Sequence, residues 1–360
     1  MAKTKILCMA DGGLTPDIFQ RMKDLEKSFD CEVTIMVDES ISTYTKTMDR
    51  MHECEYEGIK AAVTYPPLLE AVKDADILCV HMTSVNREVI EAGKNLKIVD
   101  CMRGGFENVD IKACTEHGII MINSSWRSAP AVADTTIGMM IAENKNIARS
   151  HLAIVQGGWR KQYKNQAYIR NMDRCTVGII GFGYIGRQVV RRLKGFGCKI
   201  LVYDPFLDPK VITDAGETFA PLDELLEKSD FVSLHIRLSE KTHHWFGGEQ
   251  FAKMKPTAYF INLARSGIVD TAALIKALQD ETIGGAALDV FDEEPLPADS
   301  PFRTLDNVTL LSHMAGTSGD TMACSIDIGF DDISRFLRGE PMENVRNPEV
   351  LDHCRANQGK

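Results

Sequence analysis

The stretch Thr176-Val-Gly-Ile-Ile-Gly-Phe-Gly-Tyr-Ile-Gly-Arg-Gln-Val-Val-Arg-Arg-Leu193 decides the fold of this chain. An apolar run typical of a buried strand leads into Gly181-x-Gly183-x-x-Gly186, and a helical pattern follows. Gly181 permits a tight turn, Gly183 lets a pyrophosphate approach the backbone, and Gly186 lets the helix pack against the strand. A strand, a glycine-rich turn and a helix in this order are typical of a dinucleotide-binding unit.

The residues after the glycines indicate which dinucleotide binds. At the start of the helix, the backbone amides of Tyr184 and Ile185 are expected to face the phosphates. A second strand, 200–203, ends in Asp204, which follows Gly181 by 23 residues and matches the spacing of about 20 for a ribose-binding acid. Asp204 can accept hydrogen bonds from both ribose hydroxyls and would repel a 2′-phosphate. The pattern therefore predicts NAD, rather than NADP, as the cofactor.

Short apolar runs alternate with amphipathic stretches along most of the chain, which predicts doubly wound α/β layers. Runs that are apolar at consecutive positions favour parallel strands covered on both faces. These runs are Lys5–Met9, Ile77–Val80, Leu96–Val99, Ile119–Ile122, Val177–Ile180, Ile200–Tyr203, Phe231–Leu234, Tyr259–Asn262 and Val308–Leu311. Helical patterns cover Thr135–His151, Leu222–Lys228, Ala272–Asp280 and Thr321–Leu337.

Two domains are expected, because 360 residues are too many for one ordinary core. The long helical pattern of residues 135–151 lies between the first set of strands and the glycine-rich turn. The helical pattern of residues 321–337 follows the last strand of the second set. We therefore expect the chain to leave the first domain, build the second, and return. The predicted domains are residues 1–126 with 321–360, and residues 127–320.

Composition excludes several classes of function. The formal net charge is −10 with no long run of one sign, which argues against a nucleic-acid-binding surface but allows a locally positive pocket for an anionic substrate. No apolar stretch approaches the roughly 20 residues that span a bilayer. The ten cysteines include no Cys-x-x-Cys pair, which argues against a zinc or redox site. The first residues lack the layout of a signal peptide, so we expect a cytoplasmic protein with reduced cysteines and no metal.

Three polar residues in apolar surroundings are candidates for catalysis. Arg265 and His313 each follow a predicted strand, and Glu294 lies just before Pro295. All three would lie at the carboxyl ends of strands, where open α/β sheets bind ligands. Taken singly, each also has a structural explanation, as a loop cation, a turn acid and a core histidine.

Four segments together resemble the D-isomer-specific 2-hydroxyacid dehydrogenase family, which includes phosphoglycerate, glycerate and D-lactate dehydrogenases. They are residues 181–186, 254–270, 285–295 and 312–316, and the first 130 or so residues match more loosely, through 103–110 and 118–123. The resemblance implies a Rossmann NAD-binding domain inserted in a flavodoxin-like substrate domain. It also implies a small anionic 2-hydroxy or 2-keto acid as substrate, and a homodimer.

The family implies roles for the three polar residues. Arg265 resembles the arginine that binds the substrate's carboxylate and keto oxygen, a task for which a guanidinium fork is better suited than lysine. His313 resembles the acid/base that exchanges a proton with the C2 oxygen, and Glu294 resembles the carboxylate that holds the imidazole. The physics agrees, because a hydroxyl proton must leave as the hydride leaves C2, and a nearby carboxylate stabilises imidazolium.

Further residues receive roles by the same resemblance. Asp289 resembles the residue that contacts the nicotinamide carboxamide, and Leu263 and Ala264 would lie along the cofactor. The candidates for substrate binding in the first domain are Arg103, Gly104, Gly105, His81 and Trp126. Each of these candidates also has an alternative interpretation. Residues 103–105 could form a glycine turn, His81 could lie in a surface loop, and Trp126 could pack at the hinge between the domains.

The chain departs from the family pattern at two places. Family members usually read His-x-Pro-Leu-Thr where this chain reads His-Ile-Arg-Leu-Ser over residues 235–239, and Arg237 could support a 2′-phosphate. Val80 and His81 stand where phosphoglycerate dehydrogenases have a phosphate-binding arginine, which counts against phosphoglycerate as substrate. Two alternatives remain at this level: a formate dehydrogenase of the same family, and an NAD-sensing scaffold similar to the C-terminal-binding-protein corepressors.

Overall fold

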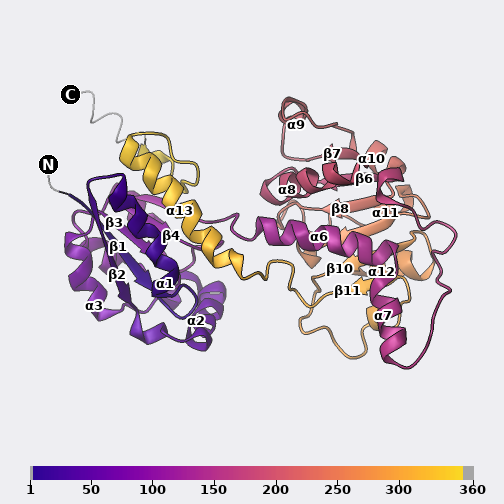
Figure 1. Ribbon diagram of the computed structural model, residues 1–360, viewed down its shortest axis with the longest axis horizontal. Coiled ribbons are helices and arrows are strands. Elements are labelled where there is room, and N and C mark those ends of the chain that lie inside the picture. The colour runs from indigo at the N-terminus through magenta and orange to yellow at the C-terminus, as the bar shows by residue number, and fades with distance from the viewer. Residues whose placement is uncertain (1–2, 352–360) are drawn as a thin grey trace. The chain divides into compact units, whose positions relative to one another are not determined.

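The computed structural model describes residues 3–351, without the side chains of residues 55 and 56, and it forms two compact units (Figure 1). Unit 1 comprises the chain up to Ser128 and again from Ser318, and unit 2 comprises Ala129–Thr317. The limits predicted from the sequence, after residues 126 and 320, lie two and three residues away from these, and the turns that precede helices α6 and α13 both belong to unit 1. Residues 352–360 of the predicted first domain lie outside the described chain.

Unit 1 is built on a parallel sheet in the order β2-β1-β3-β4-β5, the flavodoxin-like order that the sequence analysis predicts. The order reverses between β1 and β3, so the carboxyl ends of these two strands flank the position where such sheets bind ligands. The strands are β1 (Thr4–Ala10), β2 (Cys31–Val37), β3 (Ile77–Val80), β4 (Ile98–Cys101) and β5 (Ile120–Asn123). The helices are α1 (Pro16–Phe19), α2 (Tyr44–Glu57), α3 (Pro66–Ala71), α4 (Arg87–Ala92), α5 (Ile111–Glu116) and α13 (Asp320–Arg338).

Alternation along the strands of unit 1 builds a core on each face of its sheet. Ile6 and Cys8 of β1 point to one face and pack with Phe19 of α1 and residues of α13. Leu7 and Met9 point to the other face and pack with residues of α3, α4 and α5. Figure 1 shows α13, in yellow, lying beside α1 in this unit. Because β1, β3, β4 and β5 are buried at consecutive positions, both faces of the sheet need helices, which is why the chain must return to complete unit 1.

Unit 2 is a parallel sheet in the order β11-β10-β9-β8-β6-β7. A single parallel bridge between Val202 and Phe219 extends it beyond β7, which completes the Rossmann arrangement with a third strand reduced to one residue. The strands are β6 (Thr176–Ile180), β7 (Lys199–Tyr203), β8 (Phe231–Leu234), β9 (Tyr259–Asn262), β10 (Gly285–Leu288) and β11 (Val308–Leu310). The helices are α6 (Ala129–Asn144), α7 (Ile147–Val155), α8 (Tyr184–Leu193), α9 (Pro209–Asp214), α10 (Leu222–Lys228), α11 (Gly248–Lys253) and α12 (Thr271–Gln279).

The helix predicted over residues 135–151 is two helices, α6 and α7. Asn146 separates them in a left-handed conformation, with φ at 56°, which asparagine adopts more readily than most residues. The break is held by a buried ion pair, because Arg149 of α7 donates to both carboxylate oxygens of Glu143 at 2.9 and 3.0 Å. Within residues 3–351, no helix combines the length and the apolar character that crossing a membrane would require.

Candidate active site

All strands of unit 2 are parallel, so their carboxyl ends lie along one edge of the sheet. Gly181 follows β6, Arg265 comes shortly after β9, and His313 comes shortly after β11. The fold therefore brings the glycine-rich turn and the candidate catalytic residues to the same edge, although they are up to 132 residues apart in sequence (181 to 313).

The glycine-rich turn has the geometry that a phosphate cradle needs. Gly181 has a φ of 104°, and a Cβ there would lie 2.6 Å from the backbone of His235. A Cβ on Gly186 would lie 2.0 Å from the carbonyl oxygen of Gly181, so only glycine lets α8 pack this closely. A Cβ on Gly183 would meet nothing within 4 Å, which leaves an open approach to the backbone. Gly181 and Gly186 are therefore needed for close packing, whereas Gly183 leaves the backbone open to a ligand.

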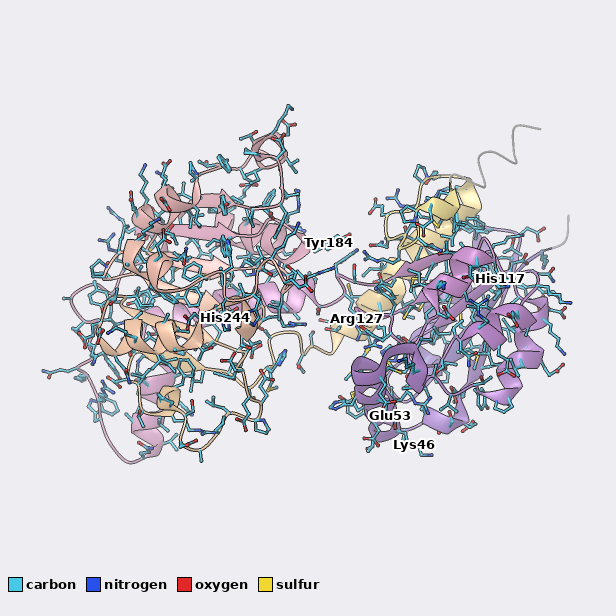
Figure 2. The ribbon with its side chains drawn as sticks, turned by 180° about the vertical axis from the view of Figure 1, so that it is seen from behind. Lys46, Glu53, His117, Arg127, Tyr184 and His244 are labelled. Atoms are coloured by element: carbon cyan, nitrogen blue, oxygen red, sulfur yellow. The ribbon has the colours of Figure 1, made fainter. Side chains whose placement is uncertain are left out.

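The start of α8 and the end of β7 complete the dinucleotide site. Tyr184 and Ile185 lie in the first turn of α8, where the helix dipole and amides favour an anion (Figure 2). Asp204 accepts hydrogen bonds from the amides of Phe182 at 2.7 Å and Phe206 at 2.8 Å. Each carboxylate oxygen keeps a lone pair for a ribose hydroxyl. These residues fit NAD, with the adenosine ribose at Asp204.

A closed turn presents Arg265 after β9. The side chain of Asn262 accepts from the amide of Ala264 at 3.0 Å and donates to the carbonyl of Arg265 at 3.1 Å. Leu263, within the turn, is buried, whereas Arg265 is exposed. Asn262 is not among the residues predicted from the sequence, and the signal available for it was its place as the last residue of a strand that ends beside a candidate site.

His313 and Glu294 form a hydrogen-bonded pair, with 2.7 Å between Nδ1 and a carboxylate oxygen. Because an ionised carboxylate only accepts, Nδ1 carries a proton and Nε2 is left for proton exchange. The side chain of His313 is 48% exposed, so the imidazole is accessible. His313 also has a left-handed backbone, with φ at 52°. Backbone strain of this kind is found preferentially at functional sites.

The electrostatics keep Glu294 ionised. Burial is the largest influence and raises its pKa, but hydrogen bonds from His313 and from the amide of Phe291 lower it, as do the charges of His313 and Arg265. The net effect lowers the pKa of Glu294 below its usual value. Its carboxylate is therefore a stable acceptor for the Nδ1 proton of His313, and Arg265 lies near enough to act on its charge.

Asp289 fixes the segment that carries His313. Its two carboxylate oxygens accept from the amides of Met314 at 2.8 Å and Ala315 at 2.9 Å, and its carbonyl accepts from the amide of His313 at 2.9 Å. The residue is buried. In this structure Asp289 thus holds the left-handed turn, a role distinct from the cofactor contact that the family resemblance implies.

In unit 1, the loop after β4 places Arg103, Gly104 and Gly105. The guanidinium of Arg103 is buried and lies 3.2 Å from the carboxylate of Glu107. A Cβ on Gly104 would meet nothing within 4 Å, so the backbone is open there. The side-chain amide of Asn123 holds the loop by donating to the carbonyl of Gly104 at 2.8 Å. Of this loop, only Gly104 faces open space, because a Cβ on Gly105 would lie 2.3 Å from the carboxylate of Glu107, and the Arg103 side chain is buried.

His81 and Trp126 are also held within unit 1. His81 is buried, and its Nδ1 lies 3.0 Å from a carboxylate oxygen of Asp11, which the sequence analysis did not single out. Burial is the largest influence on His81 and lowers its pKa, so the imidazole is neutral and donates to an ionised Asp11. The indole of Trp126 donates to the side chain of Asn344 at 3.1 Å.

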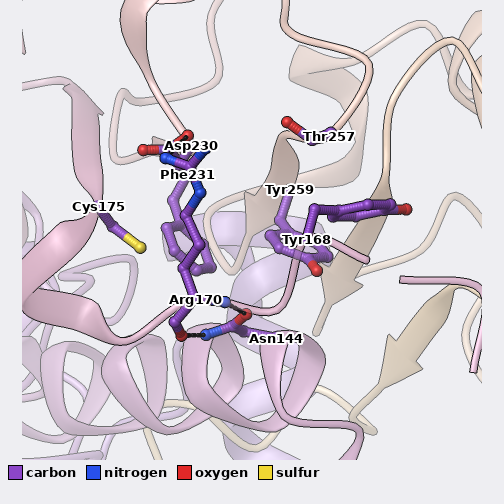
Figure 3. Close-up of a pocket in the computed structure, with 8 residues that line it drawn as sticks. All are labelled: Asn144, Tyr168, Arg170, Cys175, Asp230, Phe231, Thr257 and Tyr259. Atoms are coloured by element: carbon purple, nitrogen blue, oxygen red, sulfur yellow. Dashed lines mark hydrogen bonds and ion pairs between the residues drawn. The ribbon is translucent and has the colours of Figure 1, made fainter. Parts of the chain in front are cut away.

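A small cavity lies at the opposite, amino edge of the unit 2 sheet. It is lined by residues that precede strands, among them Cys175, Asp230 and Thr257 (Figure 3). Asp230 is already engaged by the amide of Thr176 at 2.8 Å and by Lys255 at 3.0 Å. None of the predicted site residues lines this cavity. Among residues 3–351, no three His, Cys, Asp or Glu side chains are grouped to hold a metal ion.

Comparison with known proteins identifies the family. The chain is 37% identical over 286 residues to a glyoxylate reductase of Korarchaeum cryptofilum, and the match covers 79% of this chain and 86% of that protein. The chain belongs to the D-isomer specific 2-hydroxyacid dehydrogenase family. The sequence model of that family's NAD binding domain matches residues 137–315, almost all of unit 2. The family assignment, the cofactor NAD and the oxidoreductase class predicted from sequence are thereby confirmed.

A further relative and a solved structure agree with this family assignment. A D-3-phosphoglycerate dehydrogenase of Methanocaldococcus jannaschii is 40% identical over 306 residues, which is 84% of this chain but 57% of that protein. This chain therefore spans little more than half the length of that relative. An NAD-complexed D-isomer specific 2-hydroxyacid dehydrogenase of Lactobacillus delbrueckii ssp. bulgaricus has a TM-score of 0.74 at 22% identity, covering 96% of this chain and all of the other, and so shares the fold.

Proposed function

We propose that the protein interconverts a small D-2-hydroxy acid and the corresponding 2-keto acid, with Arg265, Glu294 and His313 as the catalytic residues. The observation that carries the proposal is the accessible His313–Glu294 pair, 2.7 Å apart, on the sheet edge that also carries the glycine-rich turn. NAD, when bound at that edge, supplies the hydride chemistry at C2.

Each residue has a defined task in this proposal. The guanidinium of Arg265 binds the substrate carboxylate and the C2 oxygen, which orients C2 and polarises its bond to oxygen. In the direction of reduction, protonated His313 gives its Nε2 proton to the C2 oxygen, and in oxidation neutral Nε2 takes the hydroxyl proton. The carboxylate of Glu294 holds the ring by Nδ1 and stabilises its positive charge.

The test is turnover with a panel of 2-keto acids. Purified protein is mixed with NADH and glyoxylate, hydroxypyruvate, pyruvate or longer keto acids, and loss of NADH absorbance is followed. We expect reduction of at least one of them, lost in Arg265→Ala while NADH still binds. A folded protein that binds NADH but is inert to every keto acid contradicts the proposal and favours an NAD-sensing scaffold. Oxidation of formate alone favours a formate dehydrogenase.

We also infer that the protein is a homodimer whose interface includes α7. Several large apolar side chains on α7 and just after it are more than half exposed, namely Ile147, Leu152, Ile154, Val155 and Trp159. An apolar surface of this kind is typical of a protein–protein interface. The cytoplasmic location predicted from sequence is supported by the described cysteines, which are all free. Light scattering checks the dimer, and a monomeric mass contradicts it.

A further inference from the structure

Arg187 is the first charged residue after the glycine-rich turn of unit 2. The turn itself, residues 181–186, contains only glycine, aromatic and aliphatic residues. To an anion it therefore offers backbone amides and the dipole of α8, which amounts to about half a positive charge. The diphosphate of NAD carries two negative charges. A cation held close to the turn would thus add substantially to the binding of the diphosphate.

The geometry of α8 directs the side chain of Arg187 back toward the turn. Arg187 lies one helical turn after Gly183, whose carbonyl accepts from the amide of Arg187 at 3.1 Å. Helical side chains point toward the amino end of their helix, so a side chain at this position covers the preceding turn. The guanidinium of Arg187 accordingly lies over the ring of Phe182, 4.1 Å from the ring centroid. Its charge is therefore held beside the backbone that Gly183 leaves open.

The contact with Phe182 fixes the guanidinium without neutralising it. Phe182 is 2% exposed and belongs to the core of unit 2, so its ring is a firm support. A guanidinium that stacks on an aromatic face keeps its N–H donors for acceptors in its own plane. Among the described residues, no carboxylate pairs with Arg187. Asp204, the acid of this site, accepts from the amides of Phe182 and Phe206 instead.

The other two arginines of α8 do not share this position. Arg192 donates to the carboxylate of Asp134 and to the side chain of Gln188. Arg191 is exposed, but it lies one helical turn beyond Arg187, which places it about 6 Å farther along the helix from Gly183. Of the three, Arg187 alone combines closeness to the turn, a side chain held toward it and donors without a carboxylate partner.

We propose that Arg187 binds the diphosphate of NAD, in addition to the amides at the start of α8. A guanidinium fork matches two oxygens of a phosphate, and the contact is charge-assisted. The inference rests on NAD as the cofactor and not on the substrate or on the three catalytic residues. Because Asp204 repels a 2′-phosphate, the diphosphate is the anion that this cation favours.

The experiment compares two cofactor fragments that differ by the diphosphate. The full chain is titrated with ADP and with adenosine in a calorimeter, which needs no turnover. We expect the unaltered protein to bind ADP more tightly. Arg187→Met retains much of the aliphatic stem and should weaken ADP binding about 10- to 100-fold, the range for a hydrogen bond to a charged group, without changing adenosine binding. Arg187→Lys, which retains the charge without the fork, should weaken it less.

The matched control is Arg191→Met, on the same helix, which should leave both affinities unchanged. An Arg187→Met protein that binds ADP as tightly as the unaltered chain overturns the proposal. Equal losses for ADP and adenosine do so as well, because they show that Arg187 only covers Phe182. If adenosine binds too weakly to measure, ADP binding to Arg187→Met and to Arg191→Met decides. If Arg187→Met does not fold, Arg187→Gln takes its place.

A third fragment separates the diphosphate from the other phosphate position of a dinucleotide. Adenosine 2′,5′-bisphosphate carries a phosphate on the ribose hydroxyl that faces Asp204. We expect Arg187→Met to reduce the affinity for ADP more than that for the 2′,5′-bisphosphate. A variant that loses the 2′,5′-bisphosphate and retains ADP contradicts the proposal, because it places the cation beside the ribose.

Discussion

Each unit places a histidine beside a carboxylate at the carboxyl edge of its sheet, but the two pairs differ in exposure. In unit 1, His81 lies 3.0 Å from Asp11, with side chains 1% and 0% exposed. In unit 2, His313 lies 2.7 Å from Glu294, with side chains 48% and 35% exposed. The distances are nearly alike, so geometry does not separate them. Burial does, because it holds His81 neutral and keeps solvent and substrate from its ring, whereas His313 can exchange a proton.

The largest effect is expected when the exposed pair of His313 and Glu294 is broken. His313→Gln removes the group that exchanges a proton with the C2 oxygen, so kcat for a reduced keto acid should fall about 10²- to 10⁴-fold. NADH binding, followed by fluorescence titration, should persist, because the glycine-rich turn is untouched. His81→Gln is the companion variant. A loss of kcat as large as that of His313→Gln, at unchanged stability, would reverse the roles given to the two histidines.

The next effect concerns stability and compares the two carboxylates. Asp11→Ala leaves the amide of Gly13 and the buried amides of Leu14 and Met82 without their acceptor, and should lower the free energy of unfolding by about 3–5 kcal/mol. Glu294→Ala removes a partly exposed pair and should cost less than about 1 kcal/mol. Urea denaturation followed by circular dichroism measures both, and equal losses would contradict the comparison.

The pH dependence of the buried pair has a definite sign. The pKa of His81 is lowered in the fold, so below the unfolded value of about 6.5 the unfolded chain binds more protons than the folded one. The stability contribution of His81 is therefore complete above that pH and is lost as the pH falls. The pKa of Asp11 is also lowered, and its contribution is lost at still more acid pH.

The smallest expected effect concerns a third carboxyl group, Asp100, which is buried like Asp11 but has no hydrogen-bond partner among the described residues. Neither side-chain oxygen of Asp100 on β4 has a hydrogen-bond partner among the described residues, and one would lie 2.1 Å from a Cβ on Gly329. Burial, followed by the charge of Asp332, raises the pKa of Asp100 well above 3.8. The folded chain then retains a proton that the unfolded chain releases, so stability decreases as the pH rises above about 3.8.

Asp100→Leu retains the branched shape and removes the proton. We expect the free energy of unfolding at pH 8 to increase by about 1–2 kcal/mol, with a smaller change at pH 5. Urea denaturation at the two pH values measures this, and Asp100→Asn separates charge from shape. A stability that is lowered equally at both pH values would show that the carboxyl makes a favourable contact.

The sequence predicts the apolar parts of the fold well and the polar environments less well. Strands β6, β8 and β9 are continuous apolar runs and are predicted to within a residue. The pattern misses β2, whose exposed Glu32 and Thr34 interrupt the run, and it also misses β10, which consists mainly of glycine and alanine. It misses the break at Asn146 because a left-handed residue leaves no periodic signal.

The same limit applies to the candidate site. Local motifs in the sequence predict the three candidate catalytic residues, Arg265, Glu294 and His313. The fold places all three at one edge of the unit 2 sheet. The burial of His81 and Arg103 depends instead on Asp11 and on Glu107, and no spacing rule connects His81 with an acid 70 residues earlier. Exposure of a polar side chain is set by distant partners, so it is the last property that a sequence pattern reveals.

The hydrogen bonds of Asp289 limit how this enzyme can be redesigned. Residues 313–315 look like a surface loop that a protein engineer would exchange freely between relatives. Their backbone is instead fastened to the end of β10, so a transplanted loop without the matching aspartate would lose the orientation of its imidazole. Grafting would have to move the strand end and the loop as one cassette.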